Sequence, residues 1–124
     1  MHHSKLSSII IDCDNLEAGV NFWSQALGTE VSRVTGPYTW LRMPPGHLGI
    51  GIQAVTEPKT AKSRVHLDFE TDDLEAEVQR LEALGAQRQQ RLPDWWVMHD
   101  PCGNEFCVVA AKPAELGNDV QTWE

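Results

Sequence analysis

The clearest hydrophobic pattern in the chain is a strict alternation of apolar and polar residues from 65 to 70. This period of two is typical of a strand with one apolar and one polar face. Residues two apart project to the same side, so His66, Asp68 and Glu70 can converge on one ligand or ion. The apolar face is expected to enter a core and consists of Val65, Leu67 and Phe69.

The period then changes from that of a strand to that of a helix. Apolar residues recur at helical spacing over residues 74–84, which predicts one buried face. Asp72 and Glu75 are placed as in a capping box at the start of this helix, and Gly85 is suited to ending it. The segment therefore predicts a strand-to-helix junction with its polar residues beside it.

The same succession of elements occurs earlier in the chain. Residues 14–18, DNLEA, match residues 72–76, DDLEA, and an alternating segment precedes each of them. A repeat of about half the chain indicates two copies of one structural unit. We predict a single domain made of two repeats, about 6–55 and 64–110, with a linker at 56–63 and a C-terminal tail at 111–124.

Further alternating segments predict the remaining strands. Turn signals such as Gly36-Pro37 and Pro93-Asp94 separate them. Each copy then contains a strand, a helix and three more strands. The expected strands outside the first segment are 8–13, 29–35, 38–43, 48–55, 86–92, 95–99 and 105–110.

Charge and hydropathy exclude two classes of partner. The 124 residues carry a formal net charge of −8, whereas nucleic-acid binding requires a basic patch. No apolar run approaches the roughly 18 residues that a membrane-spanning helix needs. The three cysteines include no CxxC pair, which suits free thiols in a reducing compartment. We therefore expect a cytoplasmic protein that binds neither nucleic acid nor a membrane.

Three motifs resemble a known superfamily. They are DCDNLEAGVNFWSQALG, RVHLDFETDDLEAEVQRLEALGA and DPCGNEFC, with a tryptophan-containing strand and a strand ending in Gln53 between the first two. In this order they resemble the glyoxalase, bleomycin-resistance and extradiol-dioxygenase superfamily, also called the vicinal oxygen chelate superfamily, and most closely its small glyoxalase-like branch. The resemblance implies an α+β fold of two βαβββ modules whose mixed sheets curl into a cup, usually in a homodimer.

The resemblance also implies where a metal would bind. Metal-dependent relatives place ligands on the first and last strands of each module, and those positions hold Ser8, Gln53, His66 and Cys107 here. Of these, His66 is the strongest ligand, so we expect a site of His66, Gln53 and Cys107, with Asp68 or Glu105 as alternative donors. The ion would be zinc, nickel, iron or manganese. Ser8 and Cys107 argue against a standard glutathione-dependent glyoxalase.

Three hypotheses remain for the reaction. A metal at His66 would suit a metal-dependent lyase or dioxygenase acting on a small oxygenated or aromatic metabolite. Without a metal, the cup would sequester a drug or natural product, as bleomycin-resistance proteins do. In the third hypothesis Glu70 or Glu105 acts as base and His66 as acid.

The expected ligand contacts lie on the cup face of the sheets. Tryptophans in this face favour stacking on an aromatic ligand, and an acidic cup would also suit a cationic one. Adjacent strand residues face opposite ways, so only one of Trp95 and Trp96 is expected in the cup. The predicted ligand-binding residues are Trp40, Arg42, Gln53, Asp68 and Trp96.

Overall fold

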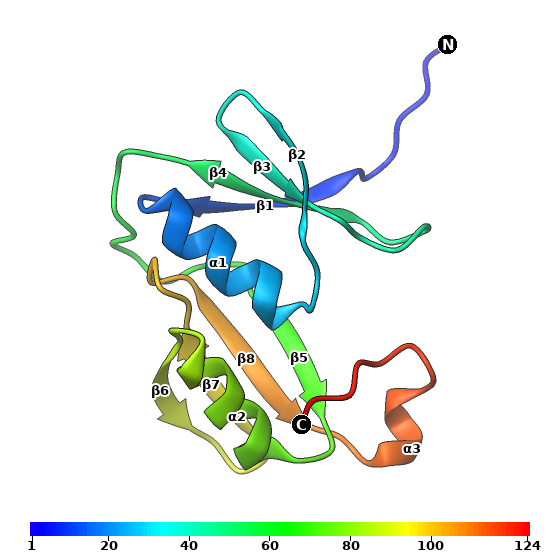
Figure 1. Cartoon of the computed structure of the whole chain (residues 1–124), viewed down its shortest axis with the longest axis vertical. Coiled ribbons are helices and arrows are strands. Elements are labelled where there is room, and N and C mark those ends of the chain that lie inside the picture. The colour runs from blue at the N-terminus through cyan, green and yellow to red at the C-terminus, as the bar shows by residue number, and fades with distance from the viewer. The chain divides into compact units, whose positions relative to one another are not determined.

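The structure is a computed structural model that describes residues 1–124. The chain forms two compact units, residues 1–58 and 59–124. Each contains a strand, a helix and three further strands in chain order (Figure 1). The first unit holds β1 (Ser8–Cys13), α1 (Leu16–Ala26), β2 (Val31–Thr35), β3 (Tyr38–Leu41) and β4 (Gly49–Ala54). The second holds β5 (Leu67–Thr71), α2 (Leu74–Ala83), β6 (Gln87–Arg91), β7 (Trp95–His99), β8 (Glu105–Ala110) and α3 (Pro113–Leu116).

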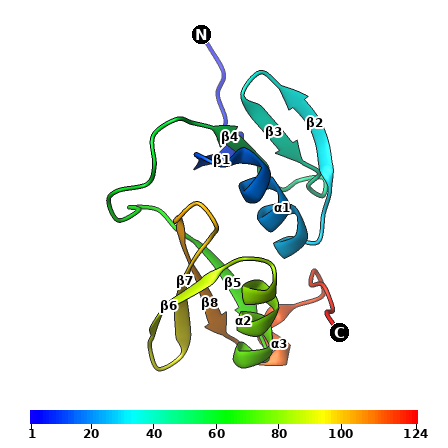
Figure 2. The same cartoon turned by 60° about the vertical axis from the view of Figure 1, so that its left-hand side comes forward.

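The two sheets share one topology. The strand orders are β1-β4-β3-β2 and β5-β8-β7-β6. In each, the first strand pairs in parallel with the last, and the other pairings are antiparallel. In Figure 2 the helix of each unit lies beside its own sheet. The predicted α+β fold of two βαβββ modules with mixed sheets is therefore confirmed.

The first unit has its own core between α1 and the sheet. Phe22 and Trp23 of α1 are buried and meet edge to face, with ring centroids 5.1 Å apart. Ile52 of β4 is fully buried with them. Gly19 lets the helix approach β1 closely, because a Cβ at this position would lie 2.5 Å from Cys13 Sγ.

The second unit has an equivalent core under α2. Val78 and Leu81 of the helix are fully buried, as are Phe106 and Val108 of β8. Phe69 of β5 is half-buried and meets the Phe106 ring edge to face at 5.8 Å. The predicted apolar faces of β5 and β8 therefore point toward α2 from Leu67 onward.

Val65 corrects the prediction for the start of β5. The strand begins at Leu67, which is the first residue paired with β8, so the preceding residues lie outside the ladder. Val65 is 81% exposed and is not a core residue. The alternation in the sequence begins before Leu67, at residues that pair with no neighbouring strand.

The structure changes the predicted N-cap of α2 and confirms Gly85 at the end of that helix. The N-cap of α2 is Asp73, whose side chain accepts a hydrogen bond from Ala76 N at 3.1 Å, so Asp72 does not cap the helix. Asn15 caps α1 in the same way. Gly28 and Gly85 end the two helices with positive φ, a conformation that glycine adopts without strain.

The C-terminal segment contains structure of its own. It includes α3, and its Trp123 ring lies 3.7 Å from the Arg80 guanidinium of α2. A cation so close to an aromatic face is attracted by the ring electrons. No helix of the chain is both long and apolar enough to cross a membrane.

Candidate functional site

A cavity of about 400 Å³ lies on the second sheet, on the face opposite the buried Phe106 and Val108. In the ladder between β7 and β8, Trp95 is paired with Val109 and Val97 with Cys107, so these four side chains share one face. Polar groups complete the wall. The lining residues are Lys62, His66, Asp68, Trp95, Val97, Glu105, Cys107 and Val109.

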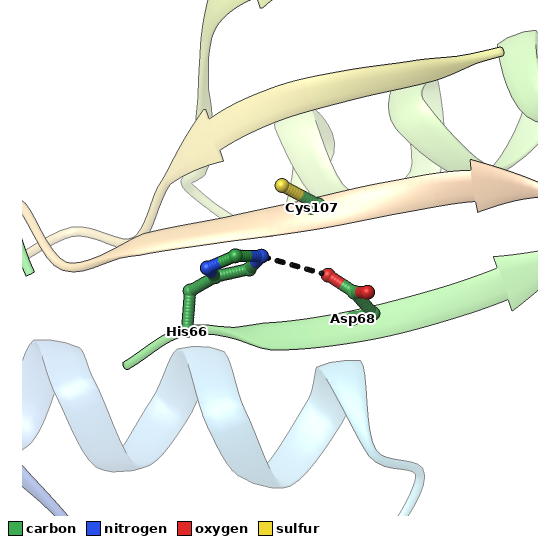
Figure 3. A group of neighbouring side chains, drawn as sticks. All are labelled: His66, Asp68 and Cys107. Atoms are coloured by element: carbon green, nitrogen blue, oxygen red, sulfur yellow. Dashed lines mark ion pairs between the residues drawn. The ribbon is translucent and has the colours of Figure 1, made fainter. Parts of the chain in front are cut away.

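Three chemically distinct donors meet in this cavity (Figure 3). His66 Nε2 lies 3.2 Å from Asp68 Oδ1, and Asp68 is paired with Cys107 in the ladder between β5 and β8. The nitrogen, the carboxylate oxygen and the Cys107 sulfur all lie within 4.8 Å of one another. Cys107 is buried, whereas the other two side chains are about half exposed, at 46% and 52%. The cluster is therefore open on one side.

The surroundings of Cys107 keep its thiol protonated. Burial raises the pKa of the thiol, and the negative charge of Asp68 raises it further. The Lys62 ammonium acts in the opposite direction but does not reverse the shift. Cys107 is therefore a neutral thiol at neutral pH and must lose a proton before it can act as a thiolate.

Glu105 is held in its ionised form by two donors. One carboxylate oxygen accepts a hydrogen bond from Ser63 N at 3.0 Å, and the other pairs with Lys59 Nζ at 2.9 Å. Burial alone would raise the pKa of Glu105, but these hydrogen bonds outweigh it and lower the pKa to about 2. A carboxylate with so low a pKa is a weak proton acceptor, which speaks against Glu105 as a general base.

The same contacts give residues 59–63 a role beyond joining two repeats. Lys59 and Ser63 anchor this segment to Glu105 at the start of β8. The anchored segment brings Lys62 to the cavity wall. The C-terminal part of the predicted linker therefore contributes to the site.

The structure corrects the facing of Trp96. Its ring lies 5.0 Å from the Arg88 guanidinium, and Arg88 in turn pairs with Glu75 of α2. Trp96 thus lies on the helix side of the sheet, and Trp95 lines the cavity instead. Glu70 is exposed on β5 and does not line this cavity.

The other expected site residues belong to the first unit. Trp40 lies on β3, and its Nε1 donates a hydrogen bond to Thr35 Oγ1 at 2.9 Å. Arg42 pairs with Glu30 at 3.3 Å. Gln53 is half-buried on β4. Their part in a site with His66 stays a prediction.

Sequence reasoning missed three residues of the cavity. Val97 and Val109 carry no chemical signal, although Val109 shares the face of Glu105 and Cys107 by alternation along β8, and the pairing with Cys107 adds Val97. Lys62 comes from a polar segment without periodicity, so nothing in the sequence assigns it to the sheet.

Protonation of Glu105 is expected to destabilise the second unit. The pKa is lowered from 4.5 to about 2, so the stabilisation is complete above pH 4.5 and is lost as the pH falls toward 2. Glu105→Gln should lower the free energy of unfolding at pH 7 by about 1–3 kcal/mol. It should also flatten the pH dependence between those values. Urea denaturation measures both, with the exposed Glu70→Gln as control. A Glu105→Gln protein as stable as its parent at pH 7 would contradict this account.

Solved structures share the fold at low sequence identity. A trypanothione-dependent glyoxalase I from Leishmania major aligns with a TM-score of 0.70 at 16% identity, over 87% of each chain. A glyoxalase/bleomycin resistance protein/dioxygenase family enzyme from Burkholderia phytofirmans PsJN aligns with a TM-score of 0.69 at 20% identity, over 86% of this chain and 98% of the other.

A third similar structure carries a metal and a ligand. It is a variant of the fosfomycin resistance protein FosX from Listeria monocytogenes, complexed with manganese(II) and 1S,2S-dihydroxypropylphosphonic acid. It aligns with a TM-score of 0.70 at 17% identity, over 92% of this chain and 95% of the other.

Sequence comparison supplies the family. No curated protein matches the chain. A model of the glyoxalase-like domain matches residues 8–109, which include β1 to β8 except the last residue of β8. The chain therefore belongs to the glyoxalase-like domain family, within the vicinal oxygen chelate superfamily.

Proposed function

We propose that the cavity on the second sheet binds a small oxygenated or aromatic metabolite. The observation that carries this proposal is the combination of an apolar floor with polar donors at one wall. Trp95, Val97 and Val109 form the floor, and His66, Asp68 and Cys107 are the donors. Sites for small molecules typically have this composition and a volume of about 300–1,000 Å³, which includes the cavity observed here.

One of the similar structures holds a ligand of this class. The FosX variant was crystallised with a small dihydroxylated phosphonic acid, which is an oxygenated molecule. At 17% identity this likeness extends to the fold alone. The argument for a ligand in this chain therefore depends on its own cavity.

A second candidate function is metal-dependent chemistry, as in a lyase or dioxygenase. The fold family implies a divalent metal, and the cluster in the second unit offers one nitrogen, one oxygen and one sulfur donor within 4.8 Å of one another. Zinc and similar ions accept this donor set, and three protein ligands leave a position for substrate. We propose that His66, Asp68 and Cys107 would hold the ion, with Asp68 in place of Gln53.

The bound ion would polarise a substrate oxygen as a Lewis acid. The chain's own residues set the conditions for binding it. His66 must be neutral, and Cys107 must release the proton that its raised pKa retains. Metal affinity should therefore rise with pH.

Metal-free acid–base catalysis has less support. His66 could exchange a proton with a ligand, and its Nε2 lies 3.2 Å from Asp68 Oδ1. Its expected partner Glu105, however, is committed to Lys59 and Ser63. Glu70 does not line the cavity.

Filling the cavity is expected to abolish ligand binding. Val109→Phe places a ring beside Trp95 and should prevent binding of the probe 2-naphthol, as measured by isothermal titration calorimetry. Trp96→Phe replaces an indole with a smaller ring on the opposite face of β7, the strand of Trp95, and serves as the control. Binding that survives Val109→Phe but is lost in Trp96→Phe would place the ligand site elsewhere.

Removing one donor is expected to weaken metal binding. Loss of a direct ligand should cost at least as much as loss of an outer partner, which is about 10–100-fold in affinity. His66→Ala, Asp68→Asn and Cys107→Ala are therefore expected to bind Zn²⁺ at least about tenfold more weakly than the parent. Elemental analysis and calorimetry of tag-free protein measure this, with His47→Ala of the first unit as control. A parent protein that binds no divalent ion would favour metal-free sequestration of a drug or natural product.

We also propose that the protein forms a homodimer. β2 is an edge strand of the first sheet, and its Val31 and Val34 are 42% and 66% exposed. Exposed apolar side chains on a strand edge commonly mark an association surface. Sedimentation should give twice the 13.9 kDa of one chain, and Val34→Lys should shift the protein toward monomer. A parent protein that sediments as a monomer would contradict this proposal.

A further inference from the structure

The second sheet carries another cavity beside the proposed ligand site. It has a volume of about 540 Å³. The two cavities share Lys62, Val97 and Glu105 in their walls, so they are adjacent compartments. The remaining lining residues of the second cavity are Lys59, Thr60, Ala61, Gln89, Gln90, His99 and Gly103.

The two compartments differ in chemistry. The first has the apolar floor of Trp95, Val97 and Val109. The second presents groups that can donate hydrogen bonds, among them the amides of Gln89 and Gln90. A ligand that fits both must combine an apolar body with a polar group that accepts hydrogen bonds.

Lys62 is the charged group at the junction that has no partner in the protein. Both carboxylates in the walls are engaged, since Glu105 binds Lys59 and Ser63 while Asp68 binds His66. The Lys59 ammonium is committed to Glu105 at 2.9 Å. Lys62 makes no hydrogen bond or ion pair, and its charge acts on Cys107 across the first cavity.

The local charge balance differs from that of the whole chain. The protein carries a net charge of −8, which should disfavour anions in general. The walls of the two cavities contain two lysines against two carboxylates, Asp68 and Glu105. These four charges balance, and because Lys59 pairs with Glu105, Lys62 is the lysine in these walls that has no ion-pair partner.

We infer that Lys62 binds an anionic group of the ligand, a carboxylate or a phosphate, while the apolar body of the ligand lies on Trp95, Val97 and Val109. This inference rests on the proposed ligand site and adds the class of molecule that it takes. The ammonium of Lys62 forms a charge-assisted hydrogen bond with the anion. The amides of Gln89 and Gln90 supply neutral donors next to it.

Two matched probes test this inference by calorimetry. They are 2-naphthoate and its uncharged analogue 2-naphthamide, which share one ring system. The parent should bind the carboxylate about tenfold more tightly than the amide, the effect expected of one added charge-assisted hydrogen bond. Added salt should weaken only the carboxylate, and 2-naphthyl phosphate should behave as the carboxylate does.

The variant Lys62→Gln assigns the preference to one residue. It should remove the tenfold difference by lowering the affinity for 2-naphthoate. Lys5→Gln, an exposed lysine of the first unit, is the control for net charge and should keep the difference.

The outcomes separate this inference from the proposed function. Equal binding of the two probes by the parent, or a preference that persists in Lys62→Gln, would overturn the role of Lys62. The ligand site itself would stand if Val109→Phe still abolished binding of 2-naphthamide. Binding of neither probe would overturn the proposed function together with this inference.

Discussion

The parallel pairing of β5 with β8 is the constraint on which the second unit depends. It sets Leu67 opposite Phe106 and Asp68 opposite Cys107. Because side chains alternate between the faces of a sheet, this register places the apolar pair toward α2 and the polar pair in the cavity. A slip of one residue would place Phe106 in the cavity and the Cys107 thiol under the helix. Core packing and the donor cluster are thus fixed by the same hydrogen bonds.

The two units share their topology but differ in chemistry. Both have the same strand order and the same kind of helix cap, with Asn15 in one and Asp73 in the other. When the two repeats are aligned, β1 corresponds to β5. Ile10 of β1 then stands at the position of Asp68 in β5. The donor cluster therefore occurs in the second unit, where an anchored segment also brings in Lys62. The two units thus share a fold and differ in the side chains on this face of the sheet.

The elements could be predicted from the sequence, because periodicity and turn residues are local signals. Alternation predicted the strands, and the repeat indicated two βαβββ modules. The first and last residues of the strands were harder to predict, because Val65 continues the alternation although no strand pairs with it. Capping depended on backbone geometry, which placed Asp73 at the N-cap instead of Asp72.

The polar residues of the site on β5 could be predicted from the sequence, and the apolar floor less well. The alternation grouped His66 with Asp68, and the structure places both beside Cys107. Periodicity gives relative facing only, so it could not decide between Trp95 and Trp96, which are adjacent and equally apolar. The pairing of β7 with β8 places Trp95 on the cavity face, beside Val109. Lys62 reaches the cavity through the contacts of Glu105 with residues 59–63, a tertiary effect with no sequence pattern.

The central claim is that the ligand lies on the Trp95 face of the second sheet. Nuclear magnetic resonance of protein labelled with ¹⁵N in the tryptophan indoles observes all five tryptophans separately. On titration with 2-naphthol, this account predicts the largest shift at the Trp95 indole, with Trp96 and Trp123 little changed. A titration that shifts Trp96 or Trp40 and leaves Trp95 unchanged would contradict it.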